Sequence, residues 1–237
     1  KNLDASVIGI LCEFIDNSIQ SYKDEKVSLE SIDSNYKLKI NIEYTKRELI
    51  ISDNAGGIEL KNWVRALKPA NKATNLNGLN EFGLGMKYAA VWVSNEWELI
   101  SKSFKESVER KVLFDYDYVV RNNIKELDYE EEVVEGNKHG TTVILRKLEE
   151  KHVSPWREEG LKKNLKSVYR NFIRKKNEYN SQFIENNIEI IAFGESLEWE
   201  DYNLLDKPWW KDIQIESIEN PRSYKWFYSF DWLSIPY

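Results

Sequence analysis

The sequence holds one cysteine, Cys12, and only two histidines, His139 and His152, in 237 residues. A single thiol excludes both an internal disulfide and a cysteine-based zinc cluster. No apolar run approaches the roughly 20 residues that a membrane-spanning helix needs. No targeting peptide is visible at the start of the sequence, so we expect a cytoplasmic protein with no membrane partner.

Hydrophobic residues make up 41% of the chain and aromatic residues 13%, which excludes a disordered or collagen-like protein. The 34 basic and 40 acidic side chains give a net charge of −6, so the chain as a whole does not attract nucleic acid. Any nucleic-acid binding must therefore come from a local basic patch.

The first 150 residues alternate helical and strand patterns. Apolar residues at Ile8, Leu11, Cys12, Ile15 and Ile19 predict a helix over about residues 3–22. Alternation over 38–44 and again up to Asp53 predicts a hairpin. Further elements are predicted in this order: a helix at 59–67, a loop that could act as a lid at 68–82, a helix from Gly83 on, and strands at 96–101, 108–114, 118–127 and 141–148. This order predicts an α+β domain with helices over one face of a sheet.

The pattern changes after His152, and we place a domain boundary near Glu150, between residues 1–150 and 151–237. A helix starting near Pro155 is predicted, followed by a strand and turn at 187–195. The apolar stripe of this helix would hold Leu161, Leu165, Val168 and Phe172. The opposite side of the helix would carry Lys162, Lys166, Arg170 and Arg174. This basic helix is either a solvated face or a surface that contacts nucleic acid. His139 and His152 have no metal-like partner spacing and are predicted to be surface residues without a role.

Four short motifs carry residues suited to binding or catalysis, and two of these motifs lie before residue 60. In "EFIDN", Glu13 and Asn17 are four residues apart and project from the same side of a helix. A carboxylate there can deprotonate water, and an amide oxygen can ligate Mg²⁺. Asp53 ends a strand and is followed by Gly56 and Gly57, which let a flat ligand approach the backbone. Its carboxylate suits an amine donor such as the adenine amino group.

The other two signals are glycine motifs. Gly83, Gly85 and Lys87 stand at a predicted helix start, where backbone N–H groups bind phosphate. The fourth, "HGTTVIL" at residues 139–145, places a glycine and two threonines at the opening of a strand.

This set, in this order, resembles the Bergerat-type GHKL ATPases, the superfamily of DNA gyrase B, the ninety-kilodalton Hsp-type chaperones, histidine kinases and MutL, and within it most resembles the microrchidia (MORC) branch. The resemblance covers about residues 3–148 and implies a two-layer α/β sandwich, followed by the start of a second, transducer-like α/β domain. One position departs from the family pattern, because Ala55 stands where the family usually has glycine.

The resemblance implies an enzyme that hydrolyses ATP with Mg²⁺. Glu13 would be the general base, Asn17 the Mg²⁺ ligand, and Asp53 and Thr141 would hold the adenine. The remaining nucleotide contacts implied are Gly57, Ile58, Lys72, Gly83, Leu84, Gly85, Met86 and Lys87.

ATPases of this family dimerise when ATP closes the lid, so the resemblance also implies an ATP-driven homodimer switch with a DNA or protein client. Four basic residues of the second region are available to approach the γ-phosphate: Lys207, Lys211, Arg222 and Lys225. Three alternatives stay open: a histidine kinase, which would normally lack the carboxylate of Glu13, a non-catalytic nucleotide sensor that acts as an interaction module, and a nucleic-acid-binding protein that uses the basic helix at 162–174.

Overall fold

The computed structural model describes residues 7–45, 48–67, 93–124, 127–148, 158–175 and 187–200. The chain divides into two units, residues 1–200 and residues 201–237, and all described residues belong to the first. None of the described helices is both long enough and apolar enough to cross a membrane.

An eight-stranded mixed sheet forms the frame of the first unit, with the strand order β5-β4-β3-β6-β2-β1-β7-β8. The described pairings are antiparallel, except that β1 and β7 run parallel. In chain order the strands are β1 (Leu38–Tyr44), β2 (Glu48–Asp53), β3 (Ser94–Lys102), β4 (Val108–Asp115), β5 (Glu130–Val133), β6 (Gly140–Leu148), β7 (Ile188–Ala192) and β8 (Glu195–Ser196). The predicted hairpin ending at Asp53 is confirmed as β1 and β2.

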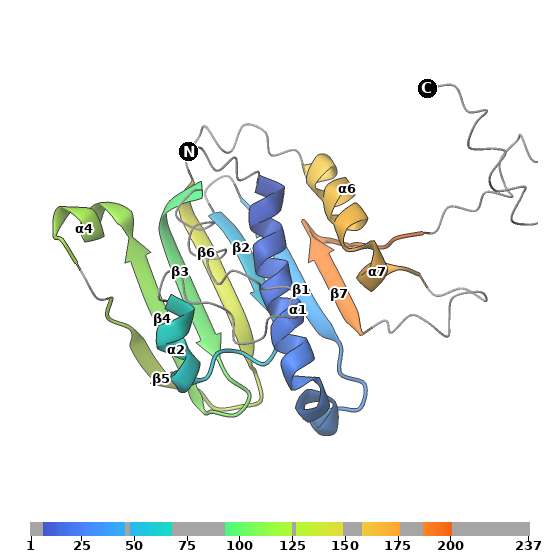
Figure 1. The fold of residues 1–237 in the computed structure, drawn as a ribbon, viewed down its shortest axis with the longest axis horizontal. Helices are drawn as coiled ribbons and strands as arrows, with labels where there is room; N and C mark the ends of the chain where they lie inside the picture. Colours follow the sequence, from blue (N-terminus) through green and yellow to red (C-terminus); the bar gives the residue numbers. More distant parts are fainter. Residues whose placement is uncertain are drawn as a thin grey trace, which may run out of the picture. The chain divides into compact units, whose positions relative to one another are not determined.

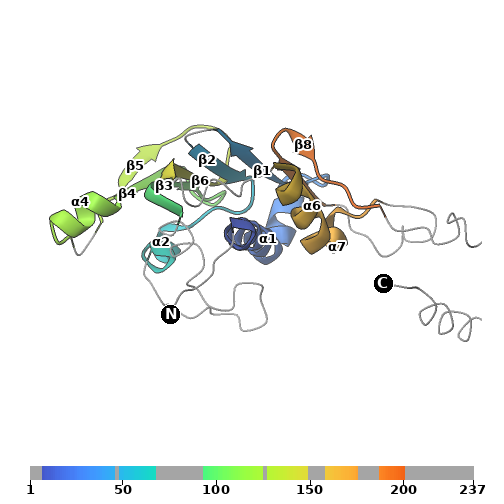
Figure 2. The same ribbon diagram turned by 90° about the horizontal axis from the view of Figure 1, so that it is seen from above.

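Helices cover one face of this sheet. Figure 1 shows the long helix α1 (Val7–Ile32) running across the middle strands, with α2 (Leu60–Leu67) on one side and α6 (Glu158–Val168) and α7 (Arg170–Ile173) on the other. Figure 2 shows these four helices below the sheet in that view. The core lies between the layers, where Leu11, Ile15 and Ile19 of α1 and Ile40 and Ile42 of β1 are fully buried. The predicted fold class, a two-layer α/β sandwich of the Bergerat type, is confirmed.

Helix α1 extends ten residues beyond the predicted end at residue 22. The polar sequence after Tyr22 concealed this extension, although Leu29, which stands seven residues after Tyr22, is fully buried and continues the apolar stripe. An ion pair between Lys26 and Glu30 lies on the same extension, at the spacing that supports a helix.

Two elements near the sheet edge differ from the prediction. The segment predicted as a strand at 118–127 begins as a helix, α4 (Tyr116–Arg121), because the Asp115 carboxylate accepts a hydrogen bond from the Tyr118 N–H and caps it. Its tyrosines and valines, which favour strands, are exposed or only partly buried. Strand β5 was not predicted because its sequence, EEEV, has no apolar alternation. An ion pair between Glu131 and Arg110 of β4 supports it.

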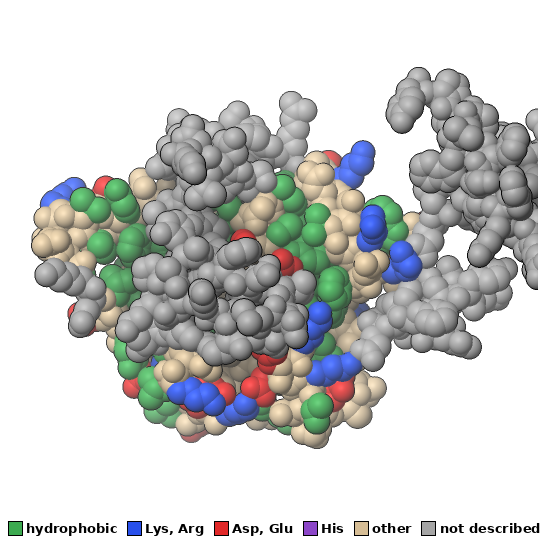
Figure 3. Space-filling view, in the orientation of Figure 1, with side chains coloured by type: hydrophobic (Ala, Val, Ile, Leu, Met, Phe, Trp, Pro, Cys, Tyr) green, Lys and Arg blue, Asp and Glu red, His purple; other side chains and the backbone are tan. Residues whose placement is uncertain are grey.

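The predicted apolar stripe of the second region is wrong at Val168, which is 56% exposed. The helix ends there, and a turn at Tyr169 leads into α7, so that the buried positions are Leu161, Leu165, Tyr169 and Ile173. Figure 3 shows Lys and Arg side chains along the outer side of α6 and α7. Two lysines of α6, Lys162 and Lys166, both form ion pairs with Glu195.

Strand β7 lies beyond the predicted boundary near Glu150, yet it pairs with β1 over five residues, from Leu38 with Ile188 to Ile42 with Ala192. The strand and turn predicted at 187–195 are confirmed. Residues 158–175 and 187–200 therefore share the sheet and core of the preceding residues. The sequence pattern does not reveal this pairing.

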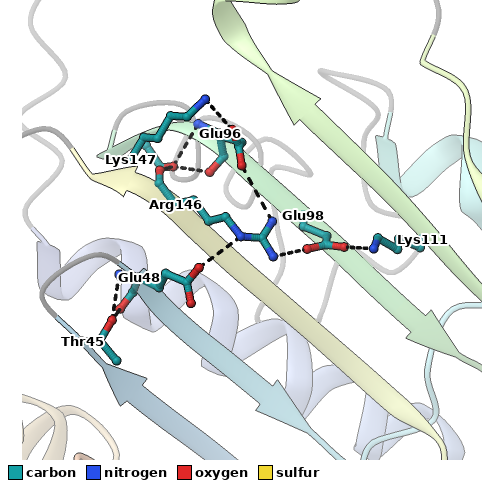
Figure 4. Close-up of polar contacts among 8 residues, drawn as sticks. Thr45, Glu48, Glu96, Glu98, Lys111, Arg146 and Lys147 are labelled. Atoms are coloured by element: carbon teal, nitrogen blue, oxygen red, sulfur yellow. Dashed lines mark hydrogen bonds and ion pairs between the residues drawn. The ribbon is translucent and has the colours of Figure 1, made fainter.

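The face of the sheet opposite α1 carries a network of charges around Glu98, whose side chain is 4% exposed. Figure 4 shows Glu98 between Lys111 and Arg146, and Arg146 also reaching Glu48 and Glu96. Burial alone would raise the pKa of Glu98, but the hydrogen bonds and charges of Lys111 and Arg146 outweigh it and lower the pKa. A hollow of about 350 Å³ opens beside these side chains, bounded by Leu113 and residues 128–130.

This network predicts a stability effect for the substitution Glu98→Gln. It removes a carboxylate that accepts two charged hydrogen bonds, so we expect the free energy of unfolding to fall by about 1.5–3 kcal/mol in urea denaturation at pH 7. Because the pKa of Glu98 is lowered in the folded state, its stabilisation is present above the unfolded glutamate pKa and is lost as the pH falls through the folded pKa. The difference in the free energy of unfolding between wild type and Glu98→Gln should therefore shrink in acid. Glu132→Gln, at an exposed position of β5, is the control and should change little.

Candidate active site

Asp53 is the last residue of β2, and its register places its side chain on the face that α1 covers. Its Oδ2 accepts a hydrogen bond from the Ser18 hydroxyl of α1 at 2.6 Å. Its Oδ1 accepts from the backbone N–H of Ala55 at 2.8 Å and of Thr141 at 3.1 Å. One carboxylate thus joins a helix, a loop and the start of β6.

Burial raises the pKa of Asp53, while the hydrogen bonds from Ser18, Ala55 and Thr141 and the nearby His139 oppose that rise. A carboxylate has about four acceptor positions on its two oxygens. The described donors use two on Oδ1 and one on Oδ2, so Oδ2 retains capacity for one more N–H donor.

The backbone around Asp53 is packed too closely for side chains at two glycines. A Cβ on Gly140 would lie 2.0 Å from the Asp53 carbonyl oxygen, and one on Gly57 would lie 2.0 Å from the Lys102 carbonyl oxygen. Both glycines have positive φ, +129° and +68°. Glycine is therefore required at these positions both for space and for backbone conformation.

Ala55 fits without strain. Its side chain is fully buried in the core. It is not among the described non-glycine residues with positive φ, which are Asn123, Lys147 and Phe193. Its N–H and carbonyl are both bonded, to Asp53 and to His139. The core thus accommodates the methyl group by which Ala55 differs from the glycine of the family pattern.

His139 was predicted to be a surface residue without a role, and the structure corrects this. Its Nδ1 lies 2.7 Å from the Ala55 carbonyl oxygen, so Nδ1 carries the hydrogen and donates it. The ring stacks on Tyr36 and meets the edge of Phe104, with centroids 5.9 Å away in both cases. The Tyr36 hydroxyl donates to the Asn54 carbonyl. Only the position of His139, directly before the glycine-threonine motif, could have indicated this contact.

Two hydroxyl groups, those of Ser101 and Thr141, support the loop that follows β2. Ser101 Oγ accepts a hydrogen bond from the Ile58 N–H at 3.0 Å, donates to the Gly140 carbonyl at 3.0 Å and lies 3.0 Å from the Thr141 hydroxyl. Three predicted site residues, Asp53, Ile58 and Thr141, are therefore connected by hydrogen bonds through the described structure. Ser101 was not predicted, because a serine within a strand carries no motif.

Glu13 and Asn17 lie one turn apart on α1, and Ser18, which binds Asp53, directly follows Asn17. Glu13 is exposed and Asn17 is half-buried. Partial loss of hydration, with the neighbouring charge of Asp16, raises the pKa of Glu13. Figure 3 shows acidic side chains at the surface over the N-terminal half of α1. Helix α1 thus carries a carboxylate, an amide and the hydroxyl that holds Asp53.

The other predicted nucleotide contacts lie outside the described residues, as do the predicted lid at 68–82, the helix that follows it and His152. These contacts are Lys72, Gly83, Leu84, Gly85, Met86 and Lys87. They stay predictions.

Comparison with known proteins identifies the class. A sequence model of the family described as histidine kinase-, DNA gyrase B-, and HSP90-like ATPase matches residues 5–141, more than half of the chain. The chain belongs to this family of ATPases, to which the sequence resemblance pointed. A comparison with curated proteins finds no match. The matched range contains Glu13, Asn17, Asp53 and Thr141.

The packing around Asp53 predicts that Gly140→Ala disrupts the site. The added methyl group would overlap the Asp53 carbonyl, so the loop must shift and nucleotide affinity should fall at least about tenfold, as expected for loss of one charge-assisted hydrogen bond. Gly136→Ala is a matched control, because Gly136 also has positive φ, +101°, but no atom lies within 4 Å of its added Cβ. In calorimetric titration with ATP, the affinity of Gly136→Ala should be close to that of wild type. Equal affinity in both variants would contradict the close packing.

Proposed function

We propose that the chain is a Mg²⁺-dependent ATPase module in which Asp53 selects adenine and Glu13 activates water. The observation that carries this proposal is the Asp53 carboxylate, which is oriented by three donors and keeps one acceptor position on Oδ2. The exocyclic amine of adenine is an N–H donor of the kind that this position accepts. Gly57, which packs closely against the Lys102 carbonyl, holds the loop after Asp53 against β3.

Glu13 acts as the general base in this proposal. Its raised pKa makes its carboxylate a stronger proton acceptor. It is exposed, so a water molecule can reach it. Glu13 would take a proton from that water as the water attacks the γ-phosphate and the bond from the γ-phosphate to ADP breaks. The charge of Asp16 would favour the protonated form of Glu13.

Asn17 supplies an amide oxygen, one of the hard donors that Mg²⁺ prefers, one turn from Glu13 and next to Ser18. A magnesium ion held there would neutralise charge on the phosphate oxygens. On the family resemblance, backbone groups at residues 83–87 and the side chains of Lys72 and Lys87 would bind the phosphates, and residues 68–82 would form a lid.

The resemblance to the microrchidia branch extends this proposal to an ATP-driven homodimer switch that acts on a DNA or protein client. On the resemblance, residues 151–237 would contain the start of its transducer-like region, and β7 of this region joins the sheet through β1. Two observations weaken the alternatives. Ala55 is accommodated in the core, which removes the reason for a non-catalytic sensor. Ion pairs with Glu195 occupy Lys162 and Lys166, which disfavours nucleic-acid binding by the basic helix.

The test separates binding from hydrolysis with Glu13→Gln. The amide keeps the shape of the side chain but cannot accept the proton, so we expect ATP affinity to stay within about threefold while kcat falls by about 10²–10⁴-fold. Asp24→Asn, at an exposed position of the same helix, is the control and should retain wild-type turnover. Phosphate release and calorimetry measure the two quantities. Wild-type turnover in Glu13→Gln would contradict the assignment of the base.

A further inference from the structure

Tyr169 is a buried side chain that the site described above does not use. It lies in the turn between α6 and α7, outside the range that the family match covers, and is 2% exposed. Its hydroxyl lies 3.0 Å from the Cys12 carbonyl oxygen and 2.9 Å from Asp16 Oδ1. Burial, together with these two neighbours, raises the pKa of Tyr169, so the hydroxyl keeps its hydrogen.

The two oxygens that share the single hydroxyl hydrogen of Tyr169, the Cys12 carbonyl and Asp16 Oδ1, enclose the turn of α1 that carries Glu13. Cys12 directly precedes Glu13, and Asp16 directly precedes Asn17. A donor that reaches both ends of this turn restrains its position and its rotation about the helix axis. Since Glu13 must meet a water molecule in line with a phosphate, a displacement of about 1 Å in this turn would cost up to about 100-fold in rate.

The segment that holds Tyr169 is fixed at several other points. The Tyr169 ring lies 6.3 Å from the ring of Phe172, and Lys23 of α1 stands over Phe172 at 5.2 Å. After α7, the backbone carbonyl of Ile173 accepts from the Trp199 N–H at 3.0 Å, and the Lys175 N–H donates to the Trp199 carbonyl at 2.9 Å. The segment is thus tied to α1 on one side and to the last described residues on the other.

We propose that Tyr169 is a positioning residue that holds the Glu13 turn of α1 in its hydrolytic geometry and connects it to α7 and the chain around Trp199. This inference rests on the proposed ATPase function. It assigns to residues after the family match a control that acts mainly on turnover. Two of the three described donors to Asp53, the N–H groups of Ala55 and Thr141, lie outside α1, so nucleotide binding depends less than hydrolysis on the Glu13 turn.

The experiment compares wild type with Tyr169→Phe and with Tyr22→Phe in the full chain. The first substitution removes the hydroxyl and keeps the packed ring. The second is matched, because Tyr22, nine residues after Glu13, is a buried tyrosine of α1 whose hydroxyl bonds Glu30 at 3.3 Å. For Tyr169→Phe we expect kcat to fall about tenfold, with ATP affinity within about twofold of wild type. Tyr22→Phe should match wild type in both.

Two results would overturn the proposal in an active protein. Unchanged kcat in Tyr169→Phe would show that the hydroxyl does not position the base. A parallel loss of kcat, affinity and thermal stability would show a merely structural role. A fall in kcat alone supports the proposal.

A wild-type protein that hydrolyses no ATP would remove the proposed hydrolysis, and a second readout then decides the role of Tyr169. Backbone hydrogen exchange should become faster in Tyr169→Phe over residues 12–18 and stay unchanged over residues 24–30. Unchanged exchange over residues 12–18 would overturn the proposal independently of any activity.

Discussion

The hydrogen-bonded carboxylate of Asp53 is the constraint on which the site depends. It gathers Ser18 from α1, the N–H of Ala55 from the loop after β2 and the N–H of Thr141 from β6. A buried carboxylate is costly unless donors surround it, so these contacts fix how the helix, the loop and the strand meet. The glycine at 140 and the imidazole of His139 then follow from the close approach of the two backbone segments.

Helix α1 carries both the proposed base, Glu13, and the serine that binds the proposed adenine-binding carboxylate, Asp53. Its apolar side is buried against the sheet, while Glu13 is exposed and Ser18 reaches Asp53. Any movement of α1 would therefore change the proposed base and the proposed adenine contact together, unless a separate contact acts on the Glu13 turn. Tyr169 is placed to make such a contact, from a segment whose neighbouring strand, β7, extends the sheet beside β1.

The sequence predicted elements where local pattern and burial agree and missed those set by tertiary contacts. The hairpin to Asp53 was predicted because its alternation matches its burial. Strand β5 was missed because pairing with β4 and the contact of Glu131 with Arg110, rather than apolar alternation, support it. At the site, motifs indicated Asp53 and Thr141, which bond directly. His139, Ser101 and Tyr169 act through neighbours distant in sequence, which no local spacing reveals.

The central claim is that Asp53 recognises the adenine of ATP, and calorimetric titration of wild type and Asp53→Asn with ATP and Mg²⁺ tests it most directly. An asparagine places an N–H donor or a weaker acceptor where the amine must bind, so affinity should fall by about 10–100-fold, the value of a hydrogen bond to a charged group. Asp33→Asn, in an exposed turn, should bind as wild type does. Unchanged ATP affinity in a folded Asp53→Asn protein would contradict the account.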